Sequence, residues 1–300
     1  MLWQLLTLAS LLLFKTPLAA QAQVTYGLSK GRLGDQLVSY LHAKWISYRY
    51  HLPLVYTPFP HSDAFLLHER ETRKNRQQRP VTLTDLSILE TPENKLYLIP
   101  YAPECVHDYD FFPSIYQQEH PYIQVDWEDK PFIEWVRPFV SPRLPIQLID
   151  LPKDKITVAV HIRTLTGADA RIPNLLVYFP YKFLPDTFYI DQIRWTYENM
   201  GRKPLYVFLF SNDPLIKTIA ERYKSALNIP DITFDYRKGK EDLLSDLFSM
   251  MHFDVLIRSE SNLSIVADKL GFQKIVISPQ HVEINLAGEN VVDEVKITHK

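Results

Sequence analysis

The chain has 300 residues, of which 33 are Lys or Arg and 35 are Asp or Glu, so its formal net charge at pH 7 is -2. This balance, together with 46% hydrophobic residues, argues against intrinsic disorder and against a polybasic protein that binds nucleic acid. The single cysteine, Cys105, excludes an intramolecular disulfide and a cysteine-based zinc cluster. The length predicts about two domains, at roughly 100–200 residues each.

The N-terminus has the pattern of a secretory signal peptide. Residues 2–14 are almost entirely apolar, and residues 20–22 offer a cleavage site of the small-x-small type. The apolar run is shorter than the ~20 residues that a membrane-spanning helix needs. No positive side chain precedes it, so an uncleaved signal anchor remains open. We expect a signal peptide over 1–22, entry into the secretory pathway, and a mature chain from about Gln23 without a membrane span.

The first half begins with a strand, a glycine turn and a helix. Residues 24–27 have β-type composition, Gly31 and Gly34 follow, and apolar positions then recur at helical spacing up to about Tyr50. A second strand over 54–56 completes one βαβ unit.

Two further stretches of this half lack a long regular pattern. The charge run over 69–79 predicts a solvated helix face or loop, with binding of an acidic partner as the minority alternative. Frequent prolines over 96–152 favour short helices and loops. The aromatic side chains of 97–135 are expected mainly in the core, with stacking on sugar rings as the alternative. Residues 138–152 are typical of a connection between two domains.

After residue 155 the pattern changes to β-branched runs that alternate with amphipathic segments. The predicted strands are 156–162, 205–210, 232–236, 255–257 and 274–277, and the predicted helices are 187–199, 215–227, 241–251 and 263–270. Five strands that alternate with helices predict a doubly wound parallel sheet. The fold class is therefore α/β, with an N-terminal domain over 23–150 and a C-terminal Rossmann-like domain over 151–300.

Ligands of such sheets bind beyond the carboxyl ends of the strands. The polar residues found at these ends are His161 and Arg163, then Ser211, Asn212 and Asp213, then Arg237 and Lys238, and finally Arg258, Ser259, Glu260 and Ser261. Hydroxyl groups, guanidinium groups and helix N-termini gathered at one edge suit a ligand that carries phosphate.

Arg163 is the strongest single candidate for a phosphate ligand. It shares one side of its strand with His161, and an arginine buried at that edge needs an anion to offset its desolvation. An internal carboxylate such as Asp246 would meet the same need. Both interpretations of Arg163 remain open at this point.

Motifs for metal or cofactor chemistry are missing from the sequence. Gly31 and Gly34 precede a helix with a spacing that suits either a phosphate cradle or an ordinary tight turn. The chain has no Walker lysine motif, no nucleophile elbow and no His-Glu-x-x-His helix, and its ten histidines lack ligand spacing. We expect neither a metal ion nor a bound cofactor.

Several segments taken together resemble the fucosyltransferases related to α-1,2-fucosyltransferases (glycosyltransferase family 11), with nodulation and protein O-fucosyltransferases as more distant relatives. Residues 31–37 resemble the family's Gly-Arg-Leu-Gly-Asn-Gln-Leu opening, and 158–163 resemble its His-x-Arg donor motif. Residues 246–248 and 261–264 resemble its Asp-Leu-x-x-Met to Ser-Thr-Phe-Ser block, and 210–214 resemble its Phe-Ser-Asp-Asp strand end. Order and spacing agree over most of the mature chain.

The resemblance implies a GT-B-like fold in which the domain over 23–150 faces the acceptor and the domain over 151–300 holds the donor. It also implies a metal-independent, inverting transfer of L-fucose from GDP-fucose to a hydroxyl group of a glycan. Without a metal ion, Arg163 would stabilise the charge that develops on the departing diphosphate, by ~3 kcal/mol or more. The resemblance places the donor against these residues: His161, Arg163, Ser211, Asp213, Asp246, Ser261, Asn262, Ser264, Gly31 and Gly34.

Two positions depart from the family pattern. Thr164 follows the His-x-Arg motif where many relatives have a second arginine, so one positive charge is missing from the donor pocket. Asp35 replaces an asparagine, and its carboxylate would either repel phosphate or act as the general base for the acceptor hydroxyl. We take Asp35 and Arg163 as the catalytic candidates. The alternative is a catalytically inactive module on the same scaffold that binds a glycan or a nucleotide.

Overall fold

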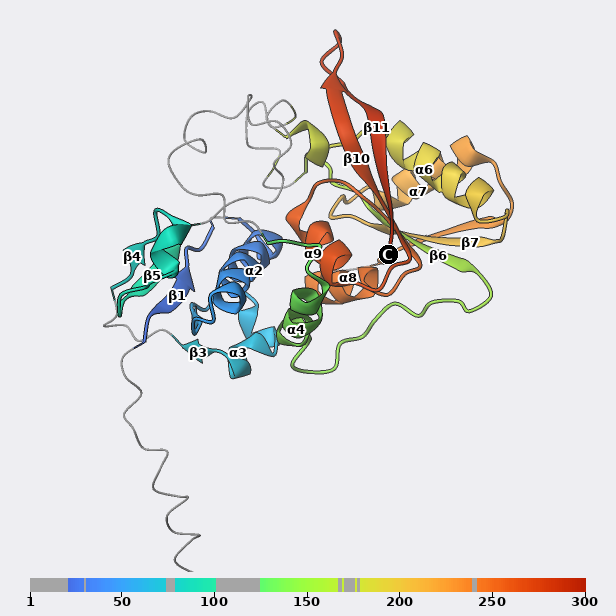
Figure 1. Cartoon of the computed structure of the whole chain (residues 1–300). Helices are drawn as coiled ribbons and strands as arrows, with labels where there is room; N and C mark the ends of the chain where they lie inside the picture. Colours follow the sequence, from blue (N-terminus) through green and yellow to red (C-terminus); the bar gives the residue numbers. More distant parts are fainter. Residues whose placement is uncertain are drawn as a thin grey trace, which may run out of the picture.

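The computed structural model of the chain describes residues 21–29, 31–73, 79–100, 125–166, 169, 176, 179–238 and 242–300 (Figure 1). The predicted signal peptide over 1–22 lies outside the described residues except for its last two positions, and Cys105 lies outside them as well. Within the described ranges, no helix combines the length and the hydropathy needed to cross a membrane.

The C-terminal half is built on one six-stranded sheet. Its strands are β6 (Ile156–His161), β7 (Leu205–Phe210), β8 (Ile232–Tyr236), β9 (Val255–Arg258), β10 (Ile275–Ile284) and β11 (Asn290–His299). They lie in the order β11-β10-β9-β6-β7-β8, and neighbours are parallel except for the pair of β10 and β11. The connecting helices are α6 (Asp186–Asn199), α7 (Ile216–Leu227), α8 (Leu243–Met250) and α9 (Asn262–Leu270). The predicted alternation of strands and helices is confirmed.

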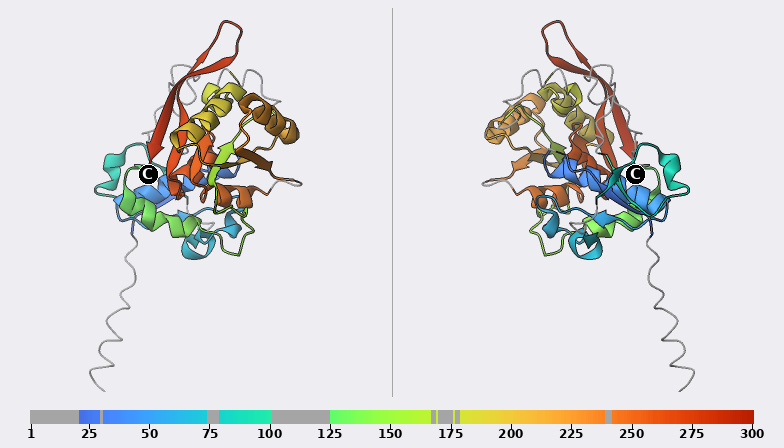
Figure 2. Two further views of the ribbon diagram at one scale, coloured as in Figure 1. Left: turned by 90° about the vertical axis from the view of Figure 1, so that its right-hand side faces the viewer. Right: turned by 90° about the vertical axis from the view of Figure 1, so that its left-hand side faces the viewer.

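Helices cover both faces of this sheet (Figure 2). Val158 and Val160 of β6 belong to a cluster with α6 and α7, whereas Ala159 belongs to a cluster with α8 and α9. Successive side chains of a strand point to opposite faces, so a strand buried on both sides is hydrophobic throughout. By the same alternation, His161 lies on the face that carries α8 and α9.

A hairpin continues β10 beyond the parallel sheet, and the sequence analysis did not identify it. The predicted strand ended at residue 277, whereas β10 reaches Ile284 and returns as β11. The turn contains Gly288 with φ 80°, a conformation that favours glycine. Val282 and Ile297 pack on the cluster of α6 and α7. The alternation of apolar and polar residues over β11 was the available signal, and the hairpin projects from the rest of the molecule (Figure 1).

The N-terminal half carries a smaller parallel sheet in the order β1-β5-β4. Its elements are β1 (Gln23–Tyr26), α2 (Leu33–Arg49), β2 (Val55–Tyr56), α3 (Leu67–Arg70), β3 (Thr72–Arg73), β4 (Val81–Thr82) and β5 (Leu96–Ile99). A parallel bridge between Val24 and Leu54 sets β2 beside β1, so the predicted βαβ unit is confirmed. The α/β class, with a parallel sheet in each half as in a GT-B-like fold, is confirmed.

One helix in the proline-rich segment is longer than expected. Helix α4 (Lys130–Val140) begins after Asp129, whose side chain accepts a hydrogen bond from the N–H of Phe132 at 2.9 Å. Pro131 fits the first turn because its missing N–H would have no partner there. Pro138 lies inside the last turn, and the helix ends two residues later. The prolines therefore mark the two ends of this helix.

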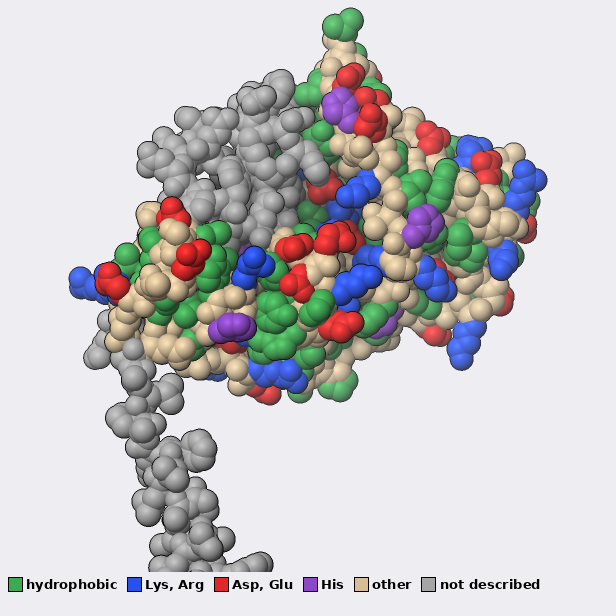
Figure 3. Space-filling model, in the orientation of Figure 1, with side chains coloured by type: hydrophobic (Ala, Val, Ile, Leu, Met, Phe, Trp, Pro, Cys, Tyr) green, Lys and Arg blue, Asp and Glu red, His purple; other side chains and the backbone are tan. Residues whose placement is uncertain are grey.

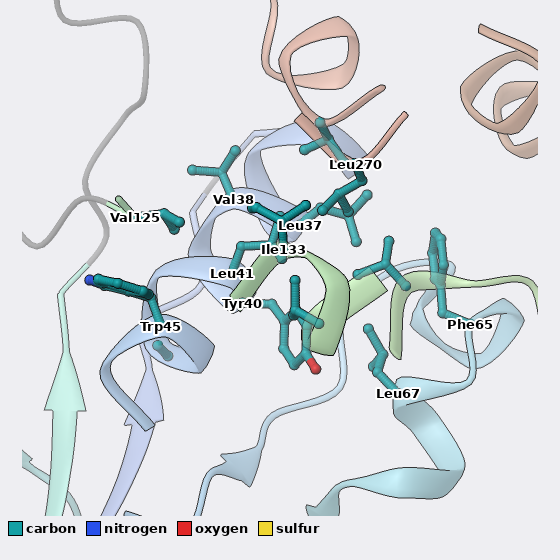
Figure 4. Packing of buried hydrophobic residues seen from close by; sticks show 14 of the residues in the cluster. Leu37, Val38, Tyr40, Leu41, Trp45, Phe65, Leu67, Val125, Ile133 and Leu270 are labelled. Atoms are coloured by element: carbon teal, nitrogen blue, oxygen red, sulfur yellow. The ribbon is translucent and has the colours of Figure 1, made fainter. Parts of the chain in front are cut away.

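The two halves share one hydrophobic core. Helices α8 and α9 lie between the large sheet and the N-terminal half, and their buried side chains form a single cluster with those of α2 and α4. Figure 4 shows Leu270 of α9 near Leu37 of α2 and Ile133 of α4. Phe65 packs on Phe248 of α8, with ring centroids 5.8 Å apart. This shared core fixes the position of α2 relative to α9.

The predicted connection over 138–152 runs across α8. The Ser249 hydroxyl accepts a hydrogen bond from the N–H of Ile149 at 3.1 Å, and the Ser245 hydroxyl donates to the carbonyl of Gln147 at 2.6 Å. The connection is therefore bound to the C-terminal half. The predicted domain boundary at residue 150 stays a prediction.

The charge run over 69–79 is not solvated throughout. The Glu71 side chain is 6% exposed and forms an ion pair with Lys44 of α2, at 2.5 Å between Oε1 and Nζ. The expectation of a solvated face is wrong for Glu71, and residues 74–78 lie outside the described part of the chain. The charge pattern around Glu71 could not predict this pair, because Lys44 lies 27 positions earlier in the chain, in α2.

Candidate functional site

Arg163 lies directly after β6 and is 7% exposed. Its Nη2 donates to the Asp169 carboxylate, and its Nη1 donates to Oδ1 of Asn212, at the end of β7, at 3.4 Å. Its Nε is buried and has no hydrogen-bond partner among the described residues. A buried polar atom without a partner costs free energy, so this Nε favours an acceptor supplied from outside the chain.

The carboxylate that pairs with Arg163 is not the one suggested by the sequence. Asp246 pairs with Arg237, which follows β8, whereas Arg163 pairs with Asp169. Of the two interpretations left open for Arg163, the structure shows a pairing with an internal carboxylate, and that carboxylate is Asp169 instead of the suggested Asp246. Asp169 stands six positions after Arg163 in a segment without periodicity, and no pattern signalled it.

Asp169 joins the two halves of the molecule through a second arginine. Nη2 of Arg32, at the start of α2, lies 3.3 Å from the same Oδ2 that Arg163 contacts. Two guanidinium groups thus share one carboxylate. The group of Arg32, Arg163 and Asp169 keeps one net positive charge, which would attract an anion.

His161 is neutral at physiological pH. It pairs in register with Arg258 of the neighbouring strand β9, and its Nδ1 is buried without a partner among the described residues. Burial, and to a smaller extent three cations, lower its pKa to about 4. The cations are Arg258, Arg32 and Lys182. His161 is therefore suited to a hydrogen bond with a ligand and not to carrying a charge.

Arg258 is buried like Arg163, but its donors are used within the chain. Its Nη1 lies 2.9 Å from Glu260, and its Nη2 lies 3.0 Å from Asp268, which also receives an ion pair from Lys300 at 3.1 Å. Burial would lower the pKa of Arg258, but the two carboxylates raise it above its ordinary value. Arg258 therefore holds the turn between β9 and α9 in place.

That turn contains the predicted serines. Ser261 precedes α9 and is 9% exposed, whereas the hydroxyl of Ser264 is buried and donates to the carbonyls of Ser259 and Ser261 at 3.2 and 3.0 Å. The Ser264 hydroxyl thus stabilises the turn. Ser261 lies at the N-terminal end of the helix, where orphan N–H groups favour an anion.

Asp35 connects α2 to α9. Its Oδ2 accepts a hydrogen bond from the N–H of Arg32 at 3.0 Å, and its Oδ1 accepts one from the Asn262 amide at 2.8 Å. The carboxylate therefore complements the N-terminal ends of both helices. Its role as a general base stays a prediction.

The two glycines before and in α2 are required by close packing. A Cβ on Gly34 would lie 2.3 Å from the backbone nitrogen of Leu263, and a Cβ on Gly31 would lie 2.3 Å from a carboxylate oxygen of Asp35. The sequence left a phosphate cradle and a tight turn open for these glycines; the structure adds close packing, a third use that the sequence did not suggest. Their approach to a donor stays a prediction.

The remaining predicted residues lie at the next strands. Asp213 accepts a hydrogen bond from the N–H of Leu215 at 2.8 Å, and its own N–H donates to the Ser211 hydroxyl at 3.2 Å, so both residues shape the turn before α7. Contacts link Arg163, Asp169 and Arg32, and Arg32 lies beside Asp35 and its partner at the start of α9. Asp246 stands apart from this group, with Arg237.

A possible metal-binding group of three side chains occurs elsewhere in the described residues. His281, Glu283 and Asp293 lie on the β10–β11 hairpin, and Nδ1 of His281 is 2.7 Å from Asp293. Figure 3 shows a histidine beside acidic side chains near the projecting end of the molecule. None of the predicted site residues belongs to this group. Metal independence of the site stays a prediction.

Comparisons with known proteins give a similarity of fold. No family model and no curated protein matches the chain. Among solved structures, a crystal structure of POFUT1 in complex with GDP-fucose aligns with a TM-score of 0.45 at 14% identity, covering 85% of this chain and 96% of the other. NodZ α-1,6-fucosyltransferase soaked with GDP-fucose aligns with a TM-score of 0.40 at 13% identity, covering 93% and 99%. The NodZ of Bradyrhizobium aligns with a TM-score of 0.41 at 12% identity, covering 93% and 99%. The similarity concerns the course of the backbone, and at these TM-scores no ligand or activity follows from it.

Proposed function

We propose that the protein is a glycosyltransferase that uses a nucleoside diphosphate sugar, with GDP-fucose as the donor and a hydroxyl group of a glycan as the acceptor. The transfer is inverting and independent of metal ions. The donor lies at the carboxyl edge of the large sheet, on the half over 151–300, and the half over 23–150 faces the acceptor. The segment over 1–22 directs the chain into the secretory pathway. We name GDP-fucose as the donor because the motifs around Arg163 and Asp35 resemble those of fucosyltransferases.

The observation that carries the proposal is a pair of buried, unpartnered polar atoms at one sheet edge. Within the described residues, Nε of Arg163 and Nδ1 of His161 have no hydrogen-bond partner. Both atoms belong to residues at the carboxyl end of β6, and ligands of parallel sheets bind at that edge. A diphosphate supplies acceptor oxygens in the geometry that a guanidinium group prefers.

The charge at the edge supports the same ligand. Asp169 neutralises one of the two guanidinium groups that contact it, which leaves one positive charge. The diphosphate gains negative charge as the bond to the sugar breaks, so Arg163 stabilises the transition state more than the ground state. His161, which is neutral, orients the donor without adding charge.

Asp35 is the proposed base for the acceptor hydroxyl. The N–H of Arg32 and the amide of Asn262 both donate to its carboxylate and hold it in position between the two halves. Asp35 lies on the N-terminal half, so the base and Arg163 come from opposite halves of the molecule.

A catalytically inactive module is the second candidate, because a specific observation favours it. Asp169 occupies Nη2 of Arg163, and the position after the His-x-Arg motif is Thr164 instead of a second arginine. Such a module would bind a nucleotide or a glycan at the same edge and release no product.

Thermal unfolding with a panel of GDP, GDP-fucose, UDP and buffer tests the proposed donor. A ligand at 100 times its dissociation constant raises the free energy of unfolding by about 2.7 kcal/mol. We expect stabilisation by GDP and GDP-fucose, equal with EDTA and with magnesium, and none by UDP. Arg163→Ala should weaken GDP binding about 100-fold, which is about 2.8 kcal/mol. Arg194→Ala, which removes a guanidinium group from α6 that donates to the carbonyl of Ala226, is the matched control.

Mass spectrometry of a glycan array after incubation with GDP-fucose separates the two candidates. A fucosylated product that Arg163→Ala abolishes supports the transferase. Nucleotide binding without any product supports an inactive module that binds nucleotide. The absence of binding to every nucleotide contradicts the transferase and favours an inactive module that binds a glycan.

A further inference from the structure

A hollow opens at the end of α2 opposite to the proposed donor edge. It has a volume of about 560 Å³, which is within the range of small-molecule sites. The residues that line it include Lys44, Ser47, Tyr48, Arg70, Glu71 and Trp135. Twelve positions of α2 separate Asp35 from Ser47, about 18 Å along the helix axis. The hollow is therefore distinct from the donor edge.

The hollow borders a buried ion pair. The side chains of Lys44 and Glu71 are each 6% exposed, with 2.5 Å between Nζ and Oε1. The Tyr40 hydroxyl donates to the same Glu71 oxygen at 2.7 Å. Burial lowers the pKa of Lys44, while Glu71 acts in the opposite direction. A paired ammonium and carboxylate at the wall of a hollow present donors and acceptors side by side.

An exposed aromatic side chain forms another wall. Trp135 of α4 is 39% exposed, whereas Trp45, in the same aromatic group, is buried. The rings of Trp135 and Tyr48 lie 5.2 Å apart, and Nζ of Lys44 lies 4.7 Å from the centre of the Trp135 ring. The indole ring of Trp135 is thus held in place by its neighbours and partly exposed, so it offers a rigid apolar surface.

We propose that this hollow binds an uncharged pyranose sugar. Pyranose C–H groups pack on the negatively polarised face of an aromatic ring, here Trp135, and adjacent hydroxyl groups hydrogen-bond with the Lys44–Glu71 pair. Lys44 and Glu71 form an ion pair and compensate each other's charge, so their donors and acceptors suit the hydroxyl groups of an uncharged ligand. The buried charges disfavour a purely apolar ligand. The site does not depend on the proposed transferase activity.

Fluorine NMR of the full-length protein labelled with 5-fluorotryptophan tests the site. The chain has five tryptophans, and the signals that disappear in Trp135→Phe and in Trp195→Phe are those of Trp135 and Trp195. The probes are methyl β-D-glucopyranoside, methyl β-D-galactopyranoside, methyl α-D-mannopyranoside and methyl α-L-fucopyranoside, with glucuronate and glucosamine as charged analogues. We expect a saturable shift of the Trp135 signal with at least one methyl glycoside, while the signal of Trp195 on α6 stays in place.

Variants complete the test. Trp135→Ala should weaken binding of that glycoside at least about tenfold, which is about 1.4 kcal/mol, and Trp135→Phe should retain part of it. Phe272→Ala removes an aromatic ring that is 58% exposed and does not line the hollow, so binding should stay unchanged. The titration itself uses the wild type, and only the Trp→Phe variants that assign the signals have to fold. A folding defect in Trp135→Ala therefore leaves the test intact. No shift with any methyl glycoside, an equal shift of Trp195, or a shift with the charged analogues alone overturns the proposal.

Discussion

Two buried arginines at neighbouring strand ends differ in how their donors are used. Arg258 ends β9 between two carboxylates, Glu260 and Asp268. Arg163 follows β6 with one carboxylate, Asp169, which is shared with another arginine, and its Nε has no partner among the described residues. The two arginines are almost equally buried, and both lie at the carboxyl ends of neighbouring strands. The difference in their partners makes one of them structural and leaves the other for a ligand.

This difference shows how a buried charge can be assigned to structure or to function. A guanidinium group whose donors are all used inside the chain stabilises its surroundings, and removal leaves its carboxylates buried and unpaired. A guanidinium group with an unpartnered buried donor lowers the stability of the ligand-free protein, and a bound ligand compensates for this loss. Functional sites commonly contain such residues, which reduce stability for the sake of binding.

The largest effect is expected at Arg258. Arg258→Met should lower the free energy of unfolding by about 3–5 kcal/mol, because Glu260 and Asp268 would lose their buried partner. Urea unfolding measures the change. Arg222→Met, which breaks an exposed pair with Asp186, should change it by less than about 1 kcal/mol. Equal losses in the two variants would show that Arg258 is no more structural than a surface residue.

Acid should destabilise the protein through His161, the neighbour of Arg258. The folded-state pKa is about 4 and the ordinary value is 6.5, so the unfolded chain binds more protons between these pH values. The free energy of unfolding should therefore fall as the pH drops from 6.5 to 4, by about 3 kcal/mol from this group. The difference between wild type and His161→Gln, followed by urea unfolding at each pH, measures it.

The matched control for this pH effect is His281. It is exposed, and its hydrogen bond with Asp293 raises its pKa, so its contribution has the opposite sign. His281→Gln should leave the acid-induced loss at least as large as in the wild type. A wild-type pH profile that His161→Gln does not flatten contradicts a neutral buried His161.

A smaller effect is expected at the contact that sets α9 against α2. A Cβ on Gly34 would lie 2.3 Å from the backbone nitrogen of Leu263. The clash should outweigh the gain of about 1 kcal/mol from alanine in a helix, so Gly34→Ala should destabilise by about 1–2 kcal/mol. Arg49→Ala, at the exposed end of the same helix, is the control. A stabilising Gly34→Ala, measured by thermal unfolding, would show that the two helices are not held this closely.

The smallest change in stability is expected at Arg163. In Arg163→Ala, Asp169 keeps Arg32 as a partner, so the free energy of unfolding should change by less than about 1 kcal/mol while nucleotide binding is lost. Arg194→Ala should leave both quantities unchanged. A loss of stability at Arg163 as large as that at Arg258 removes the distinction between the two arginines.

Much of the C-terminal half could be predicted because its signals are local. The β-branched runs and amphipathic segments between 156 and 277 each report their own periodicity, and the order of parallel strands brings their carboxyl ends to one edge. His161 and Arg163 were therefore identified together. The hairpin was missed because its strands pair with register shifts on both sides of His281 of β10, and these shifts interrupt the regular alternation that marks a strand.

Local sequence patterns could not predict which charged residues form ion pairs with one another. Asp169, Glu260 and Asp268 differ little from other acidic residues in the sequence, and Glu71 stands in a charge run that is typical of a solvated surface. Only the packing of α2 against α9 and of the loop after β6 shows which carboxylate neutralises which cation. For this reason the sequence could suggest Asp246 as a partner of Arg163, whereas Asp246 pairs with Arg237.

By itself, the sequence determined the α/β class, the alternation of strands and helices, and the polar residues at the strand ends, because periodicity and strand order depend on neighbours along the chain. The tertiary structure alone decided which buried charges are paired, why Gly34 must be small, and where an aromatic side chain remains exposed beside a hollow. These features depend on distances between segments far apart in the chain, and a charge or a ring acquires its role from what lies within a few ångströms of it.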